Sequence, residues 1–323
     1  MIKNLQFSED ILKFTRNLSH TDSMVIKVLL YFDVFNYPLL KDEIFSFLPV
    51  NNFGKEELVT SLNFLVNENY ISYYEGYYFL HKPDNSHIQR RIKGNIAAVK
   101  MMKTARRFSR LIGYFPFVRC VCISGSLSKG YIDKDADIDY FIITKPGRLW
   151  IARTLLVLFK KIFLLNYRKY FCVNYFIDED HLEIQDKNIF TATELVTLIP
   201  MNNLHLFYKF IESNHWVNRF LPNYNMYNFK NILTEKSYFK TIFEKLLNGT
   251  FGEWLDTRFM HLTINRWKNK FPNFNEEEFE LSMRSRKYVS KHHPNNFQKR
   301  VISKLEENKR QFETQFELHL QNG

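Results

Sequence analysis

The sequence predicts an α+β protein in which a small mixed β-sheet lies between helical segments. Long stretches with apolar residues at helical spacing open and close the chain. Between them lie three short runs rich in β-branched, aromatic and cysteine residues, typical of strands, at 117–124, 137–143 and 169–177. With 323 residues and 45% hydrophobic content, the chain is long enough for two or three domains. We expect domains at 1–84, 85–190 and 191–323.

The first domain is predicted to contain three helices followed by a β-hairpin. Apolar positions at helical spacing place the helices at 23–36, 41–48 and 55–67. Alternating residues on either side of Glu75-Gly76 predict a hairpin over 70–80. This order resembles the winged helix-turn-helix domains, whose third helix reads DNA. Because residues 1–82 carry a net charge of −3, and DNA affinity needs Lys and Arg, we expect an interaction module without DNA binding. A DNA-binding regulator is the alternative.

The segment 123–143 combines a Gly-Ser turn with two closely spaced aspartates. Gly125-Ser126 ends one strand, where glycine permits close backbone approach and serine offers a hydroxyl and an N–H to a phosphate. Ten residues later, Asp137 and Asp139 enter the next strand. Residues two apart in a strand point to the same face, so the two carboxylates should stand side by side. Like charges that close usually persist because a cation lies between them.

This arrangement resembles the nucleotidyltransferase superfamily, which has the DNA polymerase beta-like fold. Gly125, Ser126, Asp137 and Asp139 match its pattern in type, spacing and strand context, and the resemblance covers approximately residues 95–200. It implies that the aspartates are catalytic and hold two Mg²⁺ ions, or Mn²⁺, and that the Gly-Ser turn binds the triphosphate of a nucleotide such as ATP. The alternative is a surface turn with solvated acids.

The third strand departs from that family pattern. The family places a third carboxylate there, whereas the best-aligned residue in this chain is Asn174. An amide oxygen can ligate magnesium, but it carries no charge and cannot act as a base. The nearest acids follow the strand, at Asp178, Glu179, Asp180 and Glu183. The general base is therefore in question, and a catalytically inactive nucleotide-binding module is a second alternative.

Four further side chains are candidates for nucleotide binding. Ser128 and Lys129 follow the Gly-Ser turn closely enough to touch a triphosphate. Lys291 and His293 lie in the run Ser290 to Pro294, which we interpret as a loop that either faces the nucleotide or connects helices at the surface. If the loop faces the nucleotide, nucleotide binding should strengthen as the pH falls through the imidazole pKa of about 6.5.

Basic residues concentrate before the Gly-Ser turn and near the C-terminus. The whole chain carries a net charge of +11. Residues 83–119 alone carry +8 and residues 284–310 carry +7, so the rest of the chain is net acidic. A basic amphipathic helix expected at 85–112 supplies most of the first cluster. Both clusters either face a shared cleft that holds a polyphosphate or form solvated helix faces.

The last third of the chain is predicted to be mostly helical. Thr191 to Glu194 has the pattern of a capping box and should begin the first of these helices. The clearest later segments are 208–216, 251–267, 276–283 and a basic helix at 295–320. We expect this helical domain to close the cleft over the sheet.

Cysteine usage and apolar segments favour a cytoplasmic protein without a membrane partner. Three cysteines fall in strand segments and should be buried free thiols, as expected in a reducing compartment. The chain opens without the apolar region of a signal peptide. Its most apolar helix, 149–165, is interrupted by Arg153, Lys160 and Lys161, which argues against a membrane span.

Taken together, these features predict a metal-dependent nucleotidyltransferase. Such an enzyme transfers a nucleoside monophosphate from a nucleoside triphosphate to an acceptor and releases pyrophosphate. The sequence leaves the acceptor open among a protein, an RNA and a small molecule.

Overall fold

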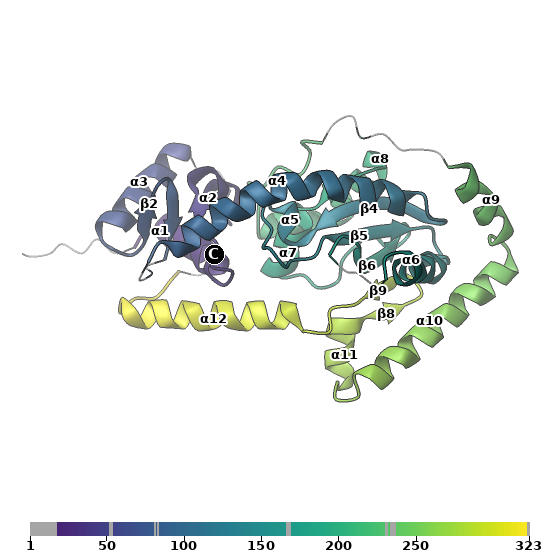
Figure 1. Ribbon diagram of the computed structural model, residues 1–323. Helices are drawn as coiled ribbons and strands as arrows, with labels where there is room; N and C mark the ends of the chain where they lie inside the picture. The colour runs from purple at the N-terminus through teal and green to yellow at the C-terminus, as the bar shows by residue number, and fades with distance from the viewer. Residues whose placement is uncertain are drawn as a thin grey trace, which may run out of the picture.

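The computed structural model describes residues 18–321 except 52–53, 81, 83, 166–168, 230–231 and 233–236. It is an α+β structure with a three-stranded and a six-stranded sheet. Figure 1 shows the small N-terminal domain at one end and the large sheet at the other, with α4 and α12 running between them on opposite sides. The expected fold class is confirmed at this level.

The N-terminal domain contains the expected three helices and hairpin. The elements are α1 (His20–Asp33), β1 (Leu39–Leu40), α2 (Lys41–Phe47), α3 (Lys55–Asn67), β2 (Ser72–Tyr74) and β3 (Tyr77–Phe79). Strand β3 lies between β1 and β2. The hairpin turns through Glu75 and Gly76, whose φ angles of 49° and 87° are both positive, as a two-residue hairpin loop requires. This part of the chain therefore folds as its local pattern predicts.

Helix α4 (Ser86–Gly113) connects this domain to the large sheet. Arg91, which is 3% exposed, fixes the connection. Its guanidinium pairs with Glu43 at 2.6 Å and lies over the rings of Tyr37 and Tyr77. One buried cation thus holds α2, the hairpin and α4 together.

The large sheet has the strand order β7-β4-β5-β6-β9-β8. Its strands are β4 (Val118–Ser124), β5 (Asp139–Thr144), β6 (Cys172–Asp178), β7 (Ile199–Pro200), β8 (Ser285–Arg286) and β9 (Val289–Lys291). Only β5 and β6 pair in parallel, and every other described pair is antiparallel. The sheet is therefore mixed, as expected.

The two faces of this sheet have separate cores. Val121 and Ile123 of β4 point to the face covered by α4 and α6 (Leu149–Phe163). Cys120 and Cys122 point to the opposite face, covered by α7 (Ile189–Val196) and α8 (Leu204–Ser213). These cysteines and Cys172 are buried free thiols, which confirms the expectation for them. The alternation of β4 thus decides which helices cover which face.

The C-terminal third does not form a separate helical domain. Its helical elements after α8 are η1 (His215–Arg219), α9 (Tyr238–Leu246), α10 (Thr250–Lys270), α11 (Glu276–Met283) and α12 (Phe297–Gln315). Strands β7, β8 and β9 also come from this part and belong to the large sheet. Helix α12 returns to the N-terminal domain, where Val301 and Phe312 join the core around α1. The 191–323 segment therefore completes both other parts of the molecule.

The capping box expected at Thr191 is wrong. Helix α7 begins two residues earlier, and its N-cap is Asn188, whose side chain accepts a hydrogen bond from the Thr191 backbone N–H. Asn is a stronger N-cap than Thr, so Asn188 sets the start of the helix in place of Thr191. The carboxylate of Glu194 is consequently free for a different role.

Among the described helices, none is long and apolar enough to cross a membrane.

Candidate active site

Four strand ends meet at one edge of the large sheet. Ser124, the last residue of β4, pairs with Asp139, the first residue of β5, and Asp139 also pairs with Cys172, the first residue of β6. Lys291, at the end of β9, lies opposite Tyr175 of β6. A cleft of about 1050 Å³ opens at this edge, and residues from α1, α7 and the start of α12 form its other walls. Its size suits a ligand as large as a nucleotide.

Asp137 and Asp139 share one wall of this cleft. Both line the cleft, whereas Ile138 between them is fully buried in the core. The strand itself begins only at Asp139, so Asp137 precedes it, but the two side chains face the same cleft as their spacing predicts. The Gly-Ser turn stands beside them, because Gly125 and Ser126 line the same wall directly after β4.

Asp139 is held in an environment that disfavours its charge. Burial raises its pKa to about 7, and the negative charges of Asp137 and Glu194 push it in the same direction. Hydrogen bonds from Cys172 and Asn174 oppose the shift. The Asn174 amide donates to Asp139 Oδ1 at 2.9 Å. Perturbed carboxylates in clefts are typical of functional sites.

Asn174 reaches Asp139 because β6 has a bulge. The register of β6 against β5 shifts between Tyr140 and Phe141, which pair with Val173 and Tyr175. Asn174 is the extra residue, so Val173 packs on one face of the sheet and Tyr175 on the other. Bulges commonly re-aim a side chain next to an active site. The residue that departs from the family pattern is therefore built into the site.

Gly125 permits the close approach of the turn to Asp139. Its φ is +70°, a conformation that favours glycine, and a Cβ there would lie 2.7 Å from Asp139 Oδ2. Any side chain at this position would fill the space between the turn and the carboxylate. The turn and the aspartate are thus built as one unit.

The residues present fit a divalent cation. Carboxylate oxygens are the ligands that Mg²⁺ prefers, and Asp137 and Asp139 present theirs to one cleft. A bound cation would favour the charged form of Asp139 and so offset the burial that raises its pKa. Among the described residues, no group of three or more His, Cys, Asp and Glu side chains has metal-binding geometry. The candidate set is therefore two aspartates, with the amide of Asn174 beside them.

Lys129 and Ser128 are turned toward the protein. The Lys129 ammonium pairs with Glu194 at 2.8 Å and donates to the Gly125 carbonyl at 3.1 Å. Ser128 is buried, and its hydroxyl donates to the same carbonyl at 2.8 Å. Lys129 lines the cleft with Glu194, whereas Ser128 supports the turn from behind. Both side chains stabilise the turn, and Lys129 is the one within reach of a cleft ligand.

Glu194 is the cleft residue that sequence reasoning missed. It comes from α7, 65 residues after Lys129, and its charge contributes to the raised pKa of Asp139. The acids considered in its place lie elsewhere: Asp178 ends β6 at the opposite edge of the sheet and bonds His181. Glu183 is exposed and pairs with Lys187. A partly apolar helix with one acid carries no local signal for such a role.

Lys291 and His293 both line the cleft, Lys291 as the last residue of strand β9 and His293 two residues after it. Lys291 is only 6% exposed, and its ammonium pairs with Asp186 at 2.9 Å and with Gln298. Burial alone would raise the pKa of Asp186, but Lys291 and Arg284 hold that pKa below its usual value. Burial, aided by the Lys291 charge, lowers the pKa of His293 to about 4. With a pKa of about 4, His293 is neutral near pH 6.5, which argues against the gain in binding expected there from its protonation.

Comparisons with known proteins add no further assignment. Neither family models, nor curated proteins, nor solved structures give a match for this chain. The function must therefore be argued from the geometry of the cleft.

Proposed function

We propose that the protein is a metal-dependent nucleotidyltransferase, which transfers a nucleoside monophosphate to an acceptor and releases pyrophosphate. One observation carries the proposal: Gly125 packs its backbone against Asp139 in a cleft that Asp137 and Ser126 also line. A turn that offers backbone N–H groups to phosphates, beside two carboxylates on one face, is the arrangement that nucleotidyl transfer needs.

Each part of the cleft has a defined task in this proposal. Gly125 and Ser126 bind the β- and γ-phosphates through backbone N–H groups and the serine hydroxyl. Asp137 and Asp139 would hold two Mg²⁺ ions, which would activate the attacking oxygen and neutralise the leaving phosphates. Lys129 keeps Glu194 paired, so that the carboxylate does not repel the phosphates. Asn174 orients Asp139 through its amide.

The acceptor's proton has no dedicated protein base in this scheme. The acceptor oxygen forms a bond to the α-phosphorus, the bond to the bridging oxygen breaks, and the acceptor proton must leave. Asn174 cannot take it, because an amide is not a base at neutral pH. Glu194 is already paired with Lys129. We therefore assign the proton to solvent or to a group of the acceptor itself.

A transfer assay with labelled nucleotides tests the proposal. The protein is incubated with Mg²⁺, cell lysate and each nucleoside triphosphate, labelled at the α-phosphate in one arm and at the γ-phosphate in the other. We expect a product labelled only in the α-arm, and none from the D137N/D139N double variant. Label from the γ-arm would indicate phosphoryl transfer, and product from the double variant would contradict the proposed site.

The second candidate is a nucleotide-binding module without catalysis. Asn174, which bonds Asp139, favours this second candidate, because the family that the sequence resembles has a carboxylate at the corresponding position. Calorimetry with a non-hydrolysable nucleoside triphosphate separates the two candidates. Binding that needs Asp137 and Asp139, together with no α-labelled product from any acceptor pool, would favour the module.

A further inference from the structure

The outer side of α4 carries a stripe of exposed cations. Ala98, Ala105 and Ile112 face the core on the other side of the helix. At 100° per residue, the stripe occupies about 140° of the helix circumference and is about 21 Å long. We call it the α4 stripe, and its members are Lys93, Lys100, Lys103, Arg106 and Arg107.

No acidic residue lies between these five cations along α4. Helix α4 contains no Asp or Glu. Within the described part of the chain, none of the five makes an ion pair or a side-chain hydrogen bond, whereas the neighbouring Arg90 and Arg91 pair with Asp133 and Glu43. Five like charges on one helix face repel one another, and such a surface attracts polyanions over a distance of about 10 Å.

The stripe begins next to the cleft. Arg90, one turn before Lys93, lines the cleft together with Asp133. The segment between the Gly-Ser turn and the aspartates is attached to the same part of α4: the Ile132 N–H donates to the Gly94 carbonyl at 3.3 Å. The Asn95 amide donates to the Gly130 carbonyl at 2.6 Å. A chain lying along α4 would therefore end at the proposed catalytic wall.

We infer that the α4 stripe binds the phosphodiester backbone of a nucleic acid, and that a nucleic-acid end is the acceptor in the transfer. The second clause rests on the proposed function, whereas the first does not. With one phosphate per about 3.4 Å of a strand in a duplex, the stripe matches about six successive phosphates. Exposed lysines and arginines without acids in between are the groups that bind such a backbone.

A lipid surface fits the stripe less well. Membrane-binding helices present a wide apolar face with Trp, Phe or Leu beside their cations. Along the stripe, the exposed apolar side chains are Ile96 and Val99, and no aromatic side chain accompanies them. The charge is therefore not backed by an apolar anchor, and the observations favour a nucleic acid.

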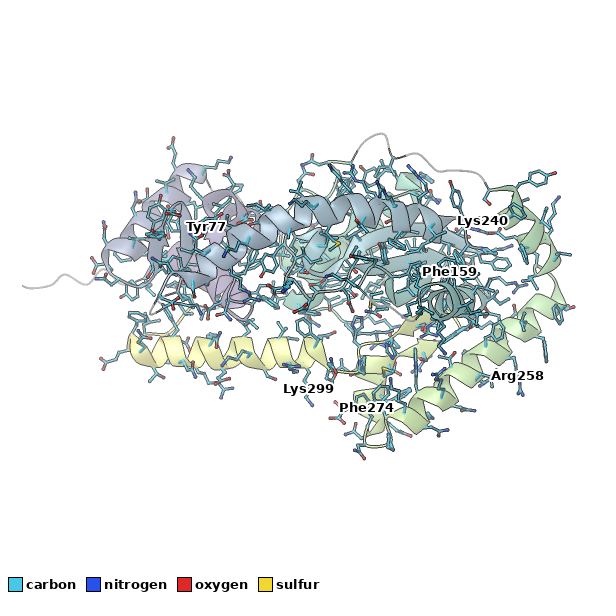
Figure 2. All side chains as sticks on the ribbon, in the orientation of Figure 1. Tyr77, Phe159, Lys240, Arg258, Phe274 and Lys299 are labelled. Atoms are coloured by element: carbon cyan, nitrogen blue, oxygen red, sulfur yellow. The ribbon has the colours of Figure 1, made fainter. Side chains whose placement is uncertain are left out.

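The test compares two variants that lose the same charge. In the stripe variant, the five members of the α4 stripe are changed to Gln. In the control variant, three lysines and two arginines that are equally exposed on α9 and α10 are changed to Gln: Lys245, Arg258, Arg266, Lys268 and Lys270. Figure 2 labels Arg258 on α10, below the large sheet and away from α4. Melting curves of both variants establish that they fold.

The probe is a 30-nucleotide single strand, used as RNA and as DNA of the same sequence, from 50 to 300 mM salt. For wild type, we expect the logarithm of the binding constant to fall with the logarithm of the salt concentration with a slope of about −3.5. This value comes from five phosphate contacts that contribute about 0.7 each. The stripe variant should lose more than about tenfold in affinity at 50 mM salt, and its slope should become shallower by about 3.5, because all five contacts are removed. The affinity of the control variant for the probe should stay within about threefold of the wild-type value. Binding of either RNA or DNA supports the inference, and the comparison of the two shows which strand the protein prefers.

Three outcomes would overturn the inference: equal affinity of the stripe variant and wild type, an equal loss in the control variant, or stripe-dependent binding to anionic lipid vesicles with no binding to either strand. The D137N/D139N variant should still bind the probe. If wild type binds through the stripe but transfers nothing, the proposed function fails and the surface assignment stands. If wild type transfers a nucleotide but does not bind through the stripe, the surface assignment fails and the proposed function stands.

Discussion

The Gly125-Ser126 turn and the Lys291 to His293 segment both border the cleft, yet they use their polar groups differently. The turn packs against Asp139 with no side chain between them and exposes its residues to the cleft. The Lys291 ammonium is committed to Asp186 and Gln298, and His293 is neutral. A phosphate site depends on polar atoms that the fold leaves unpaired with other protein groups, and a cationic sequence alone does not show which atoms those are.

The physical reason lies in the cost of burial. A charge in the middle of a mixed sheet must be paired, because an isolated buried ion is strongly destabilising. Lys291, at the end of β9, meets this requirement with Asp186. A glycine turn has no side chain to satisfy, so its backbone can remain directed at a ligand.

The largest expected effect is on transfer activity at the turn side of the cleft. Changing Asp137 or Asp139 to Asn removes one charge from the proposed metal site and should lower the transfer rate by more than about 100-fold. The matched control is Asp135→Asn, an exposed acid in the same segment, which should keep its activity. Rates are measured as α-labelled product per minute. Equal rates for Asp139→Asn and wild type would remove the aspartates from the mechanism.

The contribution of Asp139 to the unfolding free energy of the protein should depend on pH. Asp139 keeps its proton up to about pH 7 when folded, because burial raises its pKa, but only to about pH 4 when unfolded. The wild type therefore loses stability as the pH rises from about 4 to about 7, and Asn has no such loss. The advantage of Asp139→Asn in unfolding free energy should grow by roughly 2–3 kcal/mol between pH 5 and pH 8. Urea denaturation measures it, and an advantage that is constant with pH would show that Asp139 titrates normally.

On the other side of the comparison, Lys291→Met should affect the fold more than nucleotide binding. It leaves Asp186 with one cationic partner fewer in a buried position, which should cost about 3 kcal/mol of unfolding free energy. Nucleotide affinity should change by less than about threefold, because the ammonium is already paired. Urea denaturation and calorimetry with a non-hydrolysable nucleotide measure the two effects. A loss of affinity greater than the loss of stability would restore the role in phosphate binding expected from the sequence.

Two glycines with the same backbone conformation allow a finer test. Gly125 and Gly130 both have φ of +70°, but a Cβ at Gly130 meets nothing within 4 Å, whereas one at Gly125 meets Asp139. Gly130→Ala should cost about 1 kcal/mol from backbone strain alone. Gly125→Ala should cost about 1 kcal/mol more and lower transfer, since the turn and Asp139 must separate. Identical stability and activity of the two variants would show that the close contact between Gly125 and Asp139 contributes neither to the unfolding free energy nor to transfer.

The smallest expected effect concerns His293. Because burial lowers its pKa to about 4, this imidazole stays neutral between pH 6 and pH 8. Nucleotide affinity of His293→Gln, relative to wild type, should therefore be the same at both pH values. Calorimetry at pH 6 and pH 8 measures the ratio. A wild-type gain at pH 6 that the variant lacks would mean that the nucleotide protonates the imidazole.

The sequence was sufficient for elements whose contacts are local. The hairpin at Glu75-Gly76, the strand before Gly125 and the strand after Asp137 all lie where periodicity and turn residues predict them. Asp137 lies just before β5, and Asp139 begins it, yet both line the cleft with Ile138 buried between them, as their two-residue spacing predicts. In these cases, each side chain's neighbours lie within a few residues along the chain or on the next strand, so pattern and propensity agree.

Only the tertiary structure decided which charged side chains form ion pairs within the protein and which are left available to a ligand. Glu194 meets Lys129 across 65 residues, and Lys291 meets Asp186 across 105. The bulge that turns Asn174 toward Asp139 depends on how β6 pairs with β5. Residues Val289–Lys291 form a strand because they pair with the edge of β6. Pairing between distant segments is set by the burial of whole faces and by the need to neutralise buried charges. A local pattern does not contain that information.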